Sequence, residues 1–197
     1  MVKKMSTKQQ VYYTENNVKQ WIHSIMRQMS ADGFKPDYIV GITRGGLTPA
    51  SMLSYYLEIP MCTLNVSFRE NGGEELESNL WLAEEAFGYM TQSKESESTF
   101  DIAAAKNILI VDDINDTGRT IKWIKDDWEN GCLPMDERWE EVWGHNVKFA
   151  VMINNEASEF KDVDYAGLTI NKHEVPIWCV FPWEEWWRKW NPQEEHQ

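Results

Sequence analysis

The chain has 197 residues, of which 42% are hydrophobic and 26% charged, a composition that is typical of one globular domain and excludes wholesale disorder. Its formal net charge of −13 disfavours nucleic acid or an anionic membrane as a partner, because like charges repel over long range. The three cysteines show no zinc or disulfide spacing and no apolar run is long enough to span a bilayer, so we expect a cytoplasmic protein.

The first third of the chain predicts helices and strands in alternation. After Thr14, a residue that can cap a helix, apolar residues recur at the spacing of an amphipathic helix. Residues 38–42 are apolar and rich in β-branched side chains, as in a buried strand, and residues 61–68 predict another strand. Between them, the glycine-rich turn 43–46 leads into a helix at 47–57.

The alternation resumes after an acidic, weakly periodic segment, 69–101, which predicts a lid containing a short helix at 80–90. Residues 107–111 form the clearest buried strand, residues 119–130 predict a helix, and residues 147–153 predict a further strand. Strands that alternate with helices predict parallel βαβ units and a doubly wound α/β sheet.

Ligands of such sheets bind at the carboxyl ends of the strands, near the point where the strand order reverses. Two informative loops, 43–46 and 112–120, directly follow predicted strands. We therefore expect these loops to meet at one edge of the sheet.

The segment 112–120 carries the residues from which we infer the chemistry. Asp112 and Asp113 follow an apolar strand, and their oxygens can accept hydrogen bonds from sugar hydroxyls and bind Mg²⁺. Gly118 permits a tight turn into the next helix, whose first amides suit a terminal phosphate. An Asp-Asp pair alone is more often a solvated turn, and Thr-Gly-Arg-Thr alone is most often a loop. In this order after a strand, they indicate a pocket for a sugar phosphate and a metal ion.

This segment resembles the phosphoribosyl diphosphate (PRPP) binding motif of type I phosphoribosyltransferases. That motif has four apolar residues, two acids, two variable positions and then Asp-Thr-Gly-x-Thr, and every defining position matches. The resemblance implies that Asp112 and Asp113 hold the ribose hydroxyls and assist Mg²⁺. It implies that the 5-phosphate is bound by the residues that follow: Asp116, Thr117, Gly118, Arg119 and Thr120.

The same resemblance implies the organisation of the whole chain. The expected fold is α/β, with a doubly wound, mostly parallel five-stranded sheet and a small C-terminal hood. Residues 1–197 would form a single domain, with a core at about 12–155, the lid at about 69–101 and the hood at about 156–190.

Residues 39–50 are similar to the pyrophosphate loop of the xanthine–guanine and hypoxanthine (purine) subgroup, in which the peptide bond beside an arginine is often cis. Here that bond would join Thr43 and Arg44. The resemblance implies that Thr43, Arg44 and Gly45 bind pyrophosphate, with Arg44 as a permanent cation. A surface ion pair is the alternative role of Arg44.

Residues 178–184 resemble the hood segment that receives the base. Trp178 would stack on the base, or else pack in the core, and backbone groups near Cys179 would hydrogen-bond to the base edge. In the purine enzymes, a lysine after the fifth strand commonly contacts the 6-oxo group. The corresponding residue here is Asn155, which can hydrogen-bond to a base but cannot supply a charge.

The function implied is Mg²⁺-dependent transfer of the phosphoribosyl group from PRPP to a nucleobase, a purine, with release of pyrophosphate in nucleotide salvage. Arg44 would stabilise the leaving diphosphate. Asp116 would relay a proton to or from the base, or simply fix its loop. The family resemblance also implies a homodimer or higher homo-oligomer.

The residues also bear on two other functions. Residues 112–116 spell the DDxxD motif of prenyl-diphosphate synthases, but that motif lies on a helix and has a second copy, whereas this one follows a strand and stands alone. The serious alternative is a non-catalytic regulator or binding protein built on the same fold. Pyrophosphate release with a panel of bases distinguishes that alternative from the enzyme.

Overall fold

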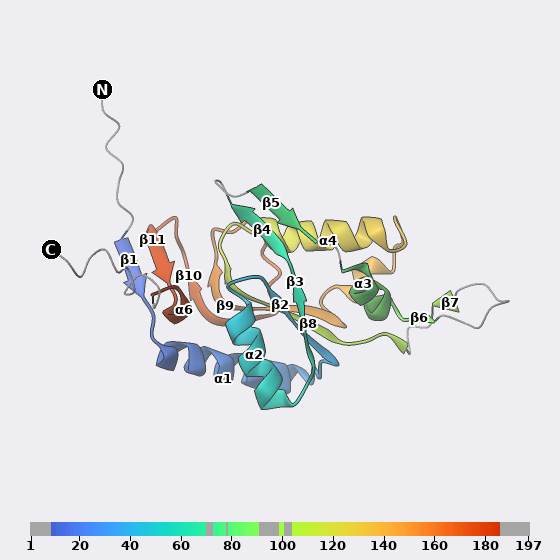
Figure 1. Ribbon diagram of the computed structural model, residues 1–197, viewed down its shortest axis with the longest axis horizontal. Coiled ribbons are helices and arrows are strands. Elements are labelled where there is room, and N and C mark those ends of the chain that lie inside the picture. Colours follow the sequence, from blue (N-terminus) through green and yellow to red (C-terminus); the bar gives the residue numbers. More distant parts are fainter. Residues whose placement is uncertain (1–8, 70–72, 78, 91–98, 101–103, 186–197) are drawn as a thin grey trace, which may run out of the picture.

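The computed structural model describes residues 9–69, 73–77, 79–90, 99–100 and 104–185. Its centre is a five-stranded sheet, entirely parallel, in the order β10-β9-β8-β2-β3 (Figure 1). The strands of this sheet, in chain order, are β2 (Tyr38–Ile42), β3 (Met61–Leu64), β8 (Ile108–Asn115), β9 (Val147–Asn155) and β10 (Tyr165–Ile170). The predicted doubly wound α/β fold is confirmed.

Helices cover both faces of the sheet (Figure 1). Leu109 packs in a hydrophobic core cluster with side chains of α1 (Glu15–Asp32) and α2 (Leu47–Leu57). The next residue, Ile110, packs in the opposite cluster, because successive strand residues point to opposite faces. The helices on that second face are α3 (Leu80–Phe87), α4 (Arg119–Gly131) and α5 (Trp139–Val142). A sheet buried on both sides explains why residues 108–111 are apolar without interruption.

Helix α1 begins and ends as the sequence indicates. Thr14 is its N-cap, and Asn17 completes a capping box: Asn17 N donates to Thr14 Oγ1 and Thr14 N donates to Asn17 Oδ1, at 3.3 and 2.9 Å. Gly33 ends the helix with a positive φ of 71°. None of the described helices is both long and apolar enough to cross a bilayer.

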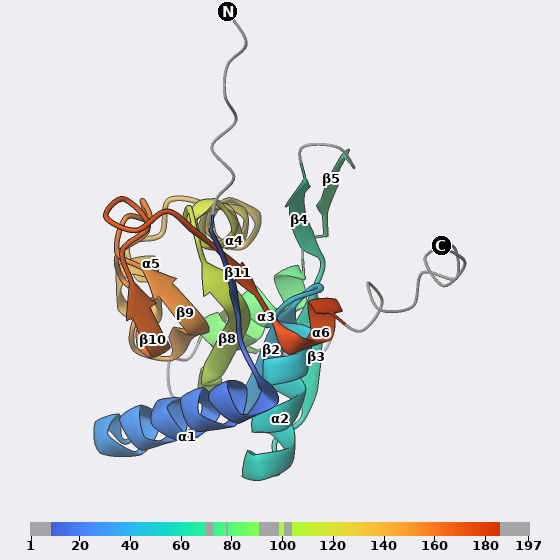
Figure 2. The same cartoon turned by 90° about the vertical axis from the view of Figure 1, so that its left-hand side faces the viewer.

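Three strands differ from their predicted bounds. β9, predicted at 147–153, continues to Asn155. β8 continues to Asn115, so Asp112 lies inside the strand and pairs with Val151 of β9, instead of following the strand. The predicted strand 61–68 is divided. β3 ends at Leu64, where its partner β2 also ends, and the chain then turns into β4 (Val66–Arg69), which pairs antiparallel with β5 (Gly73–Leu76) in a projecting hairpin (Figure 2).

The predicted lid at 69–101 includes part of the core. Leu82, Ala83 and Ala86 of α3 are completely buried against the sheet, although their spacing gave only a weak periodic signal. Beyond α3, β6 (Tyr89–Met90) pairs with β7 (Thr99–Phe100). The remaining lid positions 70–72, 78, 91–98 and 101 lie outside the described residues.

The hood is built from both ends of the described chain. β11 (Ile177–Val180) pairs in parallel with β1 (Gln9–Tyr12) in a separate two-stranded sheet, and α6 (Pro182–Glu185) follows (Figure 2). The hood was predicted at 156–190, without β1. Within that range β10 belongs instead to the main sheet, because it pairs with β9, and the positions after 185 lie outside the described residues.

Candidate active site

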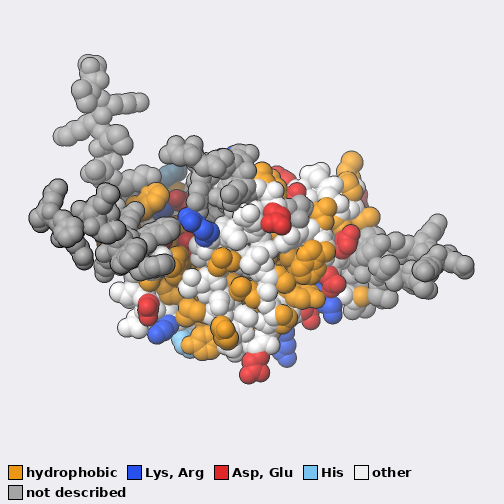
Figure 3. All heavy atoms as spheres, in the orientation of Figure 1, with side chains coloured by type: hydrophobic (Ala, Val, Ile, Leu, Met, Phe, Trp, Pro, Cys, Tyr) orange, Lys and Arg blue, Asp and Glu red, His pale blue; other side chains and the backbone are white. Residues whose placement is uncertain are grey.

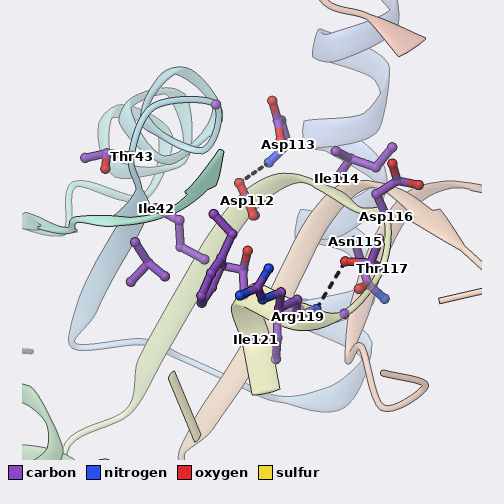
Figure 4. Close-up of a pocket in the computed structure, with 15 residues that line it drawn as sticks. Ile42, Thr43, Asp112, Asp113, Ile114, Asn115, Asp116, Thr117, Arg119 and Ile121 are labelled. Atoms are coloured by element: carbon purple, nitrogen blue, oxygen red, sulfur yellow. Dashed lines mark hydrogen bonds between the residues drawn. The ribbon is translucent and has the colours of Figure 1, made fainter. Parts of the chain in front are cut away.

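A cavity of about 360 Å³ lies at the carboxyl edge of the sheet, between the loops that leave β2 and β8. These strands are neighbours, but β3 lies beyond β2 and β9 lies beyond β8, so the two loops diverge at the reversal point of the strand order. Figure 4 shows the loop from β8 curving around the cavity. The cavity is lined by Ile42, Thr43, Gly45, Val66, Phe68 and residues 112–121.

Negative charge is concentrated at the end of β8. Asp113 N donates a 2.9 Å hydrogen bond to Asp112 Oδ1, and both side chains are partly buried (Figure 4). Burial, followed by the charge of Asp113, raises the pKa of Asp112 well above its ordinary value. Burial, followed by the charge of Glu184 in α6, raises the pKa of Asp113 to about 6. The carboxylates therefore favour a bound cation or a bound proton.

The loop after β2 packs directly on these carboxylates. A Cβ atom added to Gly45 would overlap the Asp113 carboxyl group, so only glycine allows this approach. The Thr43–Arg44 peptide bond is cis, as the sequence resemblance predicts. Thr43 Oγ1 donates to Asn65 Oδ1 at 2.7 Å, which ties the loop to the residue after β3. Thr43 and Gly45 line the cavity, and Arg44 between them is exposed.

The turn into α4 is held in a conformation suited to glycine. Gly118, the N-cap of α4, has a φ of +84°. A Cβ atom at this position would lie 2.5 Å from Phe160 N and 2.8 Å from Ser158 Oγ. The first N–H groups of a helix have no partners within the helix, and those of α4 begin beside the cavity. This arrangement can bind a phosphate group.

A layer of polar residues behind the turn fixes its position. Asn115 Nδ2 donates to Phe160 O at 2.9 Å, and Ser158 Oγ donates to Asn115 Oδ1 at 2.8 Å. Glu159 N donates to Thr117 O at 3.1 Å. The roles of Asn115 and Ser158 were not predicted. The only signal for Asn115 in the sequence is a polar residue at a variable position of the motif.

Asn155 lies outside the cavity lining and is only 5% exposed. Its Nδ2 donates to the backbone oxygen of Asp116 at 2.8 Å, while its Oδ1 accepts from Ala157 N and Lys172 N at 3.1 and 3.0 Å. The family resemblance implied that this amide hydrogen-bonds to the base. In the structure, this amide instead hydrogen-bonds to the backbone of the loop that contains Asp116.

Replacing Asn155 with alanine should lower the free energy of unfolding by about 1–3 kcal/mol, because it leaves partly buried backbone groups without their partner. Urea unfolding monitored by tryptophan fluorescence measures the change. Asn171→Ala, which removes an amide whose hydrogen bonds are solvent-exposed, should change the free energy of unfolding by less than about 0.5 kcal/mol. Equal effects of the two substitutions would contradict the bridging role of Asn155.

The two hood residues that were expected, together with Asn155, to bind the base face opposite sides of β11. Cys179 is buried in the core, where burial raises the pKa of its thiol, whereas the adjacent Trp178 is 48% exposed. Neither residue lines the cavity. The ring of Trp178 is thus exposed, and it lies outside the cavity that the turn 116–120 lines.

Residues 9–186 match the family described as phosphoribosyl transferase domain. Xanthine phosphoribosyltransferase 1 of Saccharomyces cerevisiae is 23% identical, over 91% of this chain and 92% of that protein. Hypoxanthine-guanine phosphoribosyltransferase of Schizosaccharomyces pombe is also 23% identical, over 88% of each. A purine phosphoribosyltransferase structure from Pyrococcus horikoshii has 25% identity and a TM-score of 0.57, covering 90% of this chain and 95% of that one. A xanthine-guanine-hypoxanthine phosphoribosyltransferase structure from Helicobacter pylori has 17% identity and a TM-score of 0.58, covering 94% and 98%.

Proposed function

The chain belongs to the phosphoribosyltransferase family, and on this premise we propose that it transfers the phosphoribosyl group of PRPP to a purine base and releases pyrophosphate. The matches to purine enzymes confirm the subgroup resemblance. The observation that carries the proposal is the single cavity that joins the loop after β2, the carboxylates of β8 and the start of α4. These are groups suited to a diphosphate, a ribose and a phosphate.

Each part of PRPP has a proposed place in this cavity. Asp112 and Asp113 accept hydrogen bonds from the ribose hydroxyls. The turn 116–120 binds the 5-phosphate through backbone amides and threonine hydroxyls. Thr43, Arg44 and Gly45 bind the diphosphate, and the guanidinium of Arg44 stabilises the charge that develops as the bond to the anomeric carbon breaks. Asp116 relays a proton to or from the base.

Magnesium fits the carboxylates of β8. No group of three or more His, Cys, Asp or Glu side chains among the described residues could hold a metal ion alone. Magnesium, however, is usually bound by one or two carboxylates together with substrate oxygens. The raised pKa values of Asp112 and Asp113 reflect burial and neighbouring negative charges, both of which a cation would offset. When bound by Asp112 and Asp113, Mg²⁺ would supply positive charge near the diphosphate.

Trp178 is proposed to stack on the base. Trp178→Ala should raise the KM for the base about 10–100-fold, because stacking on an aromatic ring contributes about 1–3 kcal/mol. The dissociation constant for PRPP should stay unchanged. Trp81→Ala, which removes another exposed tryptophan, is the control. Equal KM values for wild type and Trp178→Ala would remove this residue from the base site.

The function is tested by incubating the protein with Mg²⁺, PRPP and a panel of purine and pyrimidine bases and measuring pyrophosphate. Release that requires both PRPP and one of the bases is the expected result. Tight PRPP binding without turnover of any base would instead support a non-catalytic regulator.

A homodimer or larger homo-oligomer is also proposed. Hydrophobic side chains are exposed over α2 (Figure 3), and they include Tyr55 and Tyr56. Light scattering coupled to gel filtration should give at least twice the monomer mass of 23.1 kDa.

A further inference from the structure

We infer that Phe68 and Arg119 form a wall at the phosphate end of the cavity, and that this wall restricts the 5′ end of a bound ribose to a single phosphate. The inference rests on the proposed function, because it assigns a specificity determinant to the phosphate turn 116–120. It starts from a second hollow of about 510 Å³, which lies between the hairpin β4–β5 and α4 (Figure 1). We call it the outer hollow.

The cavity and the outer hollow meet at three residues. Phe68, Thr117 and Arg119 line both of them. Thr117 belongs to the turn that is proposed to bind the 5-phosphate, so the boundary between the two hollows lies beside that phosphate. The side chains of Phe68 and Arg119 therefore stand between a phosphate on the turn and the outer hollow.

Phe68 packs against two side chains of α4. The Cζ atom of Arg119 lies 4.2 Å from the centre of the Phe68 ring, and the ring of Trp123 meets the Phe68 ring edge-on, with 6.5 Å between their centres. A guanidinium over an aromatic face and an edge-to-face pair of rings both attract. Arg119 and Trp123 are one helical turn apart, so their side chains lie on the same face of α4.

The hairpin holds Phe68 on a fixed base. Val66 lies two residues earlier on β4 and therefore points to the same side of the strand, where it is 2% exposed and packs in the core. Asn65, just before β4, accepts from Thr43 Oγ1 at 2.7 Å through its side chain, and from Glu77 N at 2.9 Å through its backbone oxygen. Both ends of the hairpin are thus tied to the loop after β2.

The outer hollow offers little attraction to a second phosphate. Among the described residues that line it, the positive charges of Arg119 and Lys122 are balanced by the negative charges of Asp126 and Glu159. Lys122 Nζ is itself paired with Glu159 Oε2 at 2.8 Å. A second phosphate would have to displace Phe68 from its two partners without gaining a net positive charge. Loss of those contacts corresponds to about a 10–100-fold preference for a monophosphate.

Calorimetry tests the wall without requiring turnover. The titrants are the 5′-monophosphates and 5′-diphosphates of guanosine and adenosine, in chelator so that no metal bridges the phosphates. Each ratio compares two ligands with the same base, so it does not depend on which base the protein accepts. Wild type should bind the monophosphate about 10–100-fold more tightly than the diphosphate. Phe68→Ala should reduce this ratio to about threefold or less by raising the affinity for the diphosphate, because the turn that binds the first phosphate is retained.

Two further variants separate the wall from a general effect on the hairpin. Phe68→Leu keeps an apolar side chain in the wall and should keep part of the preference. Leu76→Ala, on the same hairpin, alters a residue that lines the outer hollow but not the cavity, and it should behave as wild type.

The possible outcomes distinguish the wall from the proposed function. Equal affinities of wild type for both phosphates, an equal loss of both affinities in Phe68→Ala, or no nucleotide binding would overturn the wall. A wild type that prefers the monophosphate but releases no pyrophosphate with any base would contradict the proposed function and leave the wall supported. Turnover without the preference would do the reverse.

Discussion

Replacement of Gly118 with alanine is expected to weaken PRPP binding at least about 100-fold. A non-glycine residue at a φ of +84° costs about 1–2 kcal/mol, and the added Cβ would approach Phe160 N to 2.5 Å. To avoid this overlap, the turn must move away from Ser158 and Phe160. The backbone amides at the start of α4 would move with it. Because each 1.4 kcal/mol changes affinity tenfold, a displaced phosphate site accounts for the loss. Isothermal titration with PRPP and Mg²⁺ measures it.

Gly33→Ala separates backbone strain from displacement of the turn. Gly33, at the C-terminal end of α1, also has a positive φ, +71°. A Cβ atom added there would meet nothing within 4 Å. This variant should lose about 1–2 kcal/mol of stability and keep its affinity for PRPP. If Gly118→Ala bound PRPP as tightly as Gly33→Ala, the phosphate would have to bind elsewhere.

Asp113→Asn is expected to weaken Mg²⁺-dependent PRPP binding about 10–100-fold, because a charged ligand for the metal and the ribose becomes neutral. The same substitution should raise the melting temperature of the metal-free protein at neutral pH. The charge of Glu184 raises the pKa of the partly buried Asp113 carboxyl group, which adjoins Asp112, and an amide of the same shape carries no charge. A variant that is less stable without metal, or that binds PRPP as wild type does, would contradict the assignment.

The stabilising effect of Asp113→Asn should depend on pH. Folding raises the pKa of Asp113 from 3.8 to about 6, so the folded protein holds this proton more tightly than the unfolded chain. Wild-type stability is therefore lost as pH rises from about 4 to about 6, by up to about 3 kcal/mol. The variant should gain most above pH 6 and nothing below about pH 4. Thermal melts in chelator test this, with the exposed Asp126→Asn as control.

Local sequence patterns predicted the elements that depend on local interactions. The capped helix α1 and the motif 112–120 are contiguous in the chain, so their residue order carries the geometry. The sequence also predicted that Thr43 and Gly45 lie near Asp113, because the carboxyl ends of parallel strands lie at the same edge of a sheet.

The features that the sequence did not predict depend on the choice of distant partners. Nothing local to residues 9–12 indicates that they pair with β11. The ion pair of Lys172 with Asp116 requires the order of β10, β9 and β8, which alternation alone leaves open. Asn155 was assigned by its position in sequence, whereas its hydrogen bonds depend on those same neighbours.

The pairing of β1 with β11 affects how the protein is completed during synthesis. The chain begins to fold from its N-terminal side, but β1 gains its partner only when residues 177–180 have left the ribosome. A nascent chain can therefore form the carboxylate pair and the turn before α4 while the hood, the proposed site for the base, still lacks one of its two strands. We therefore expect the protein to gain its ability to bind a nucleotide late in its synthesis.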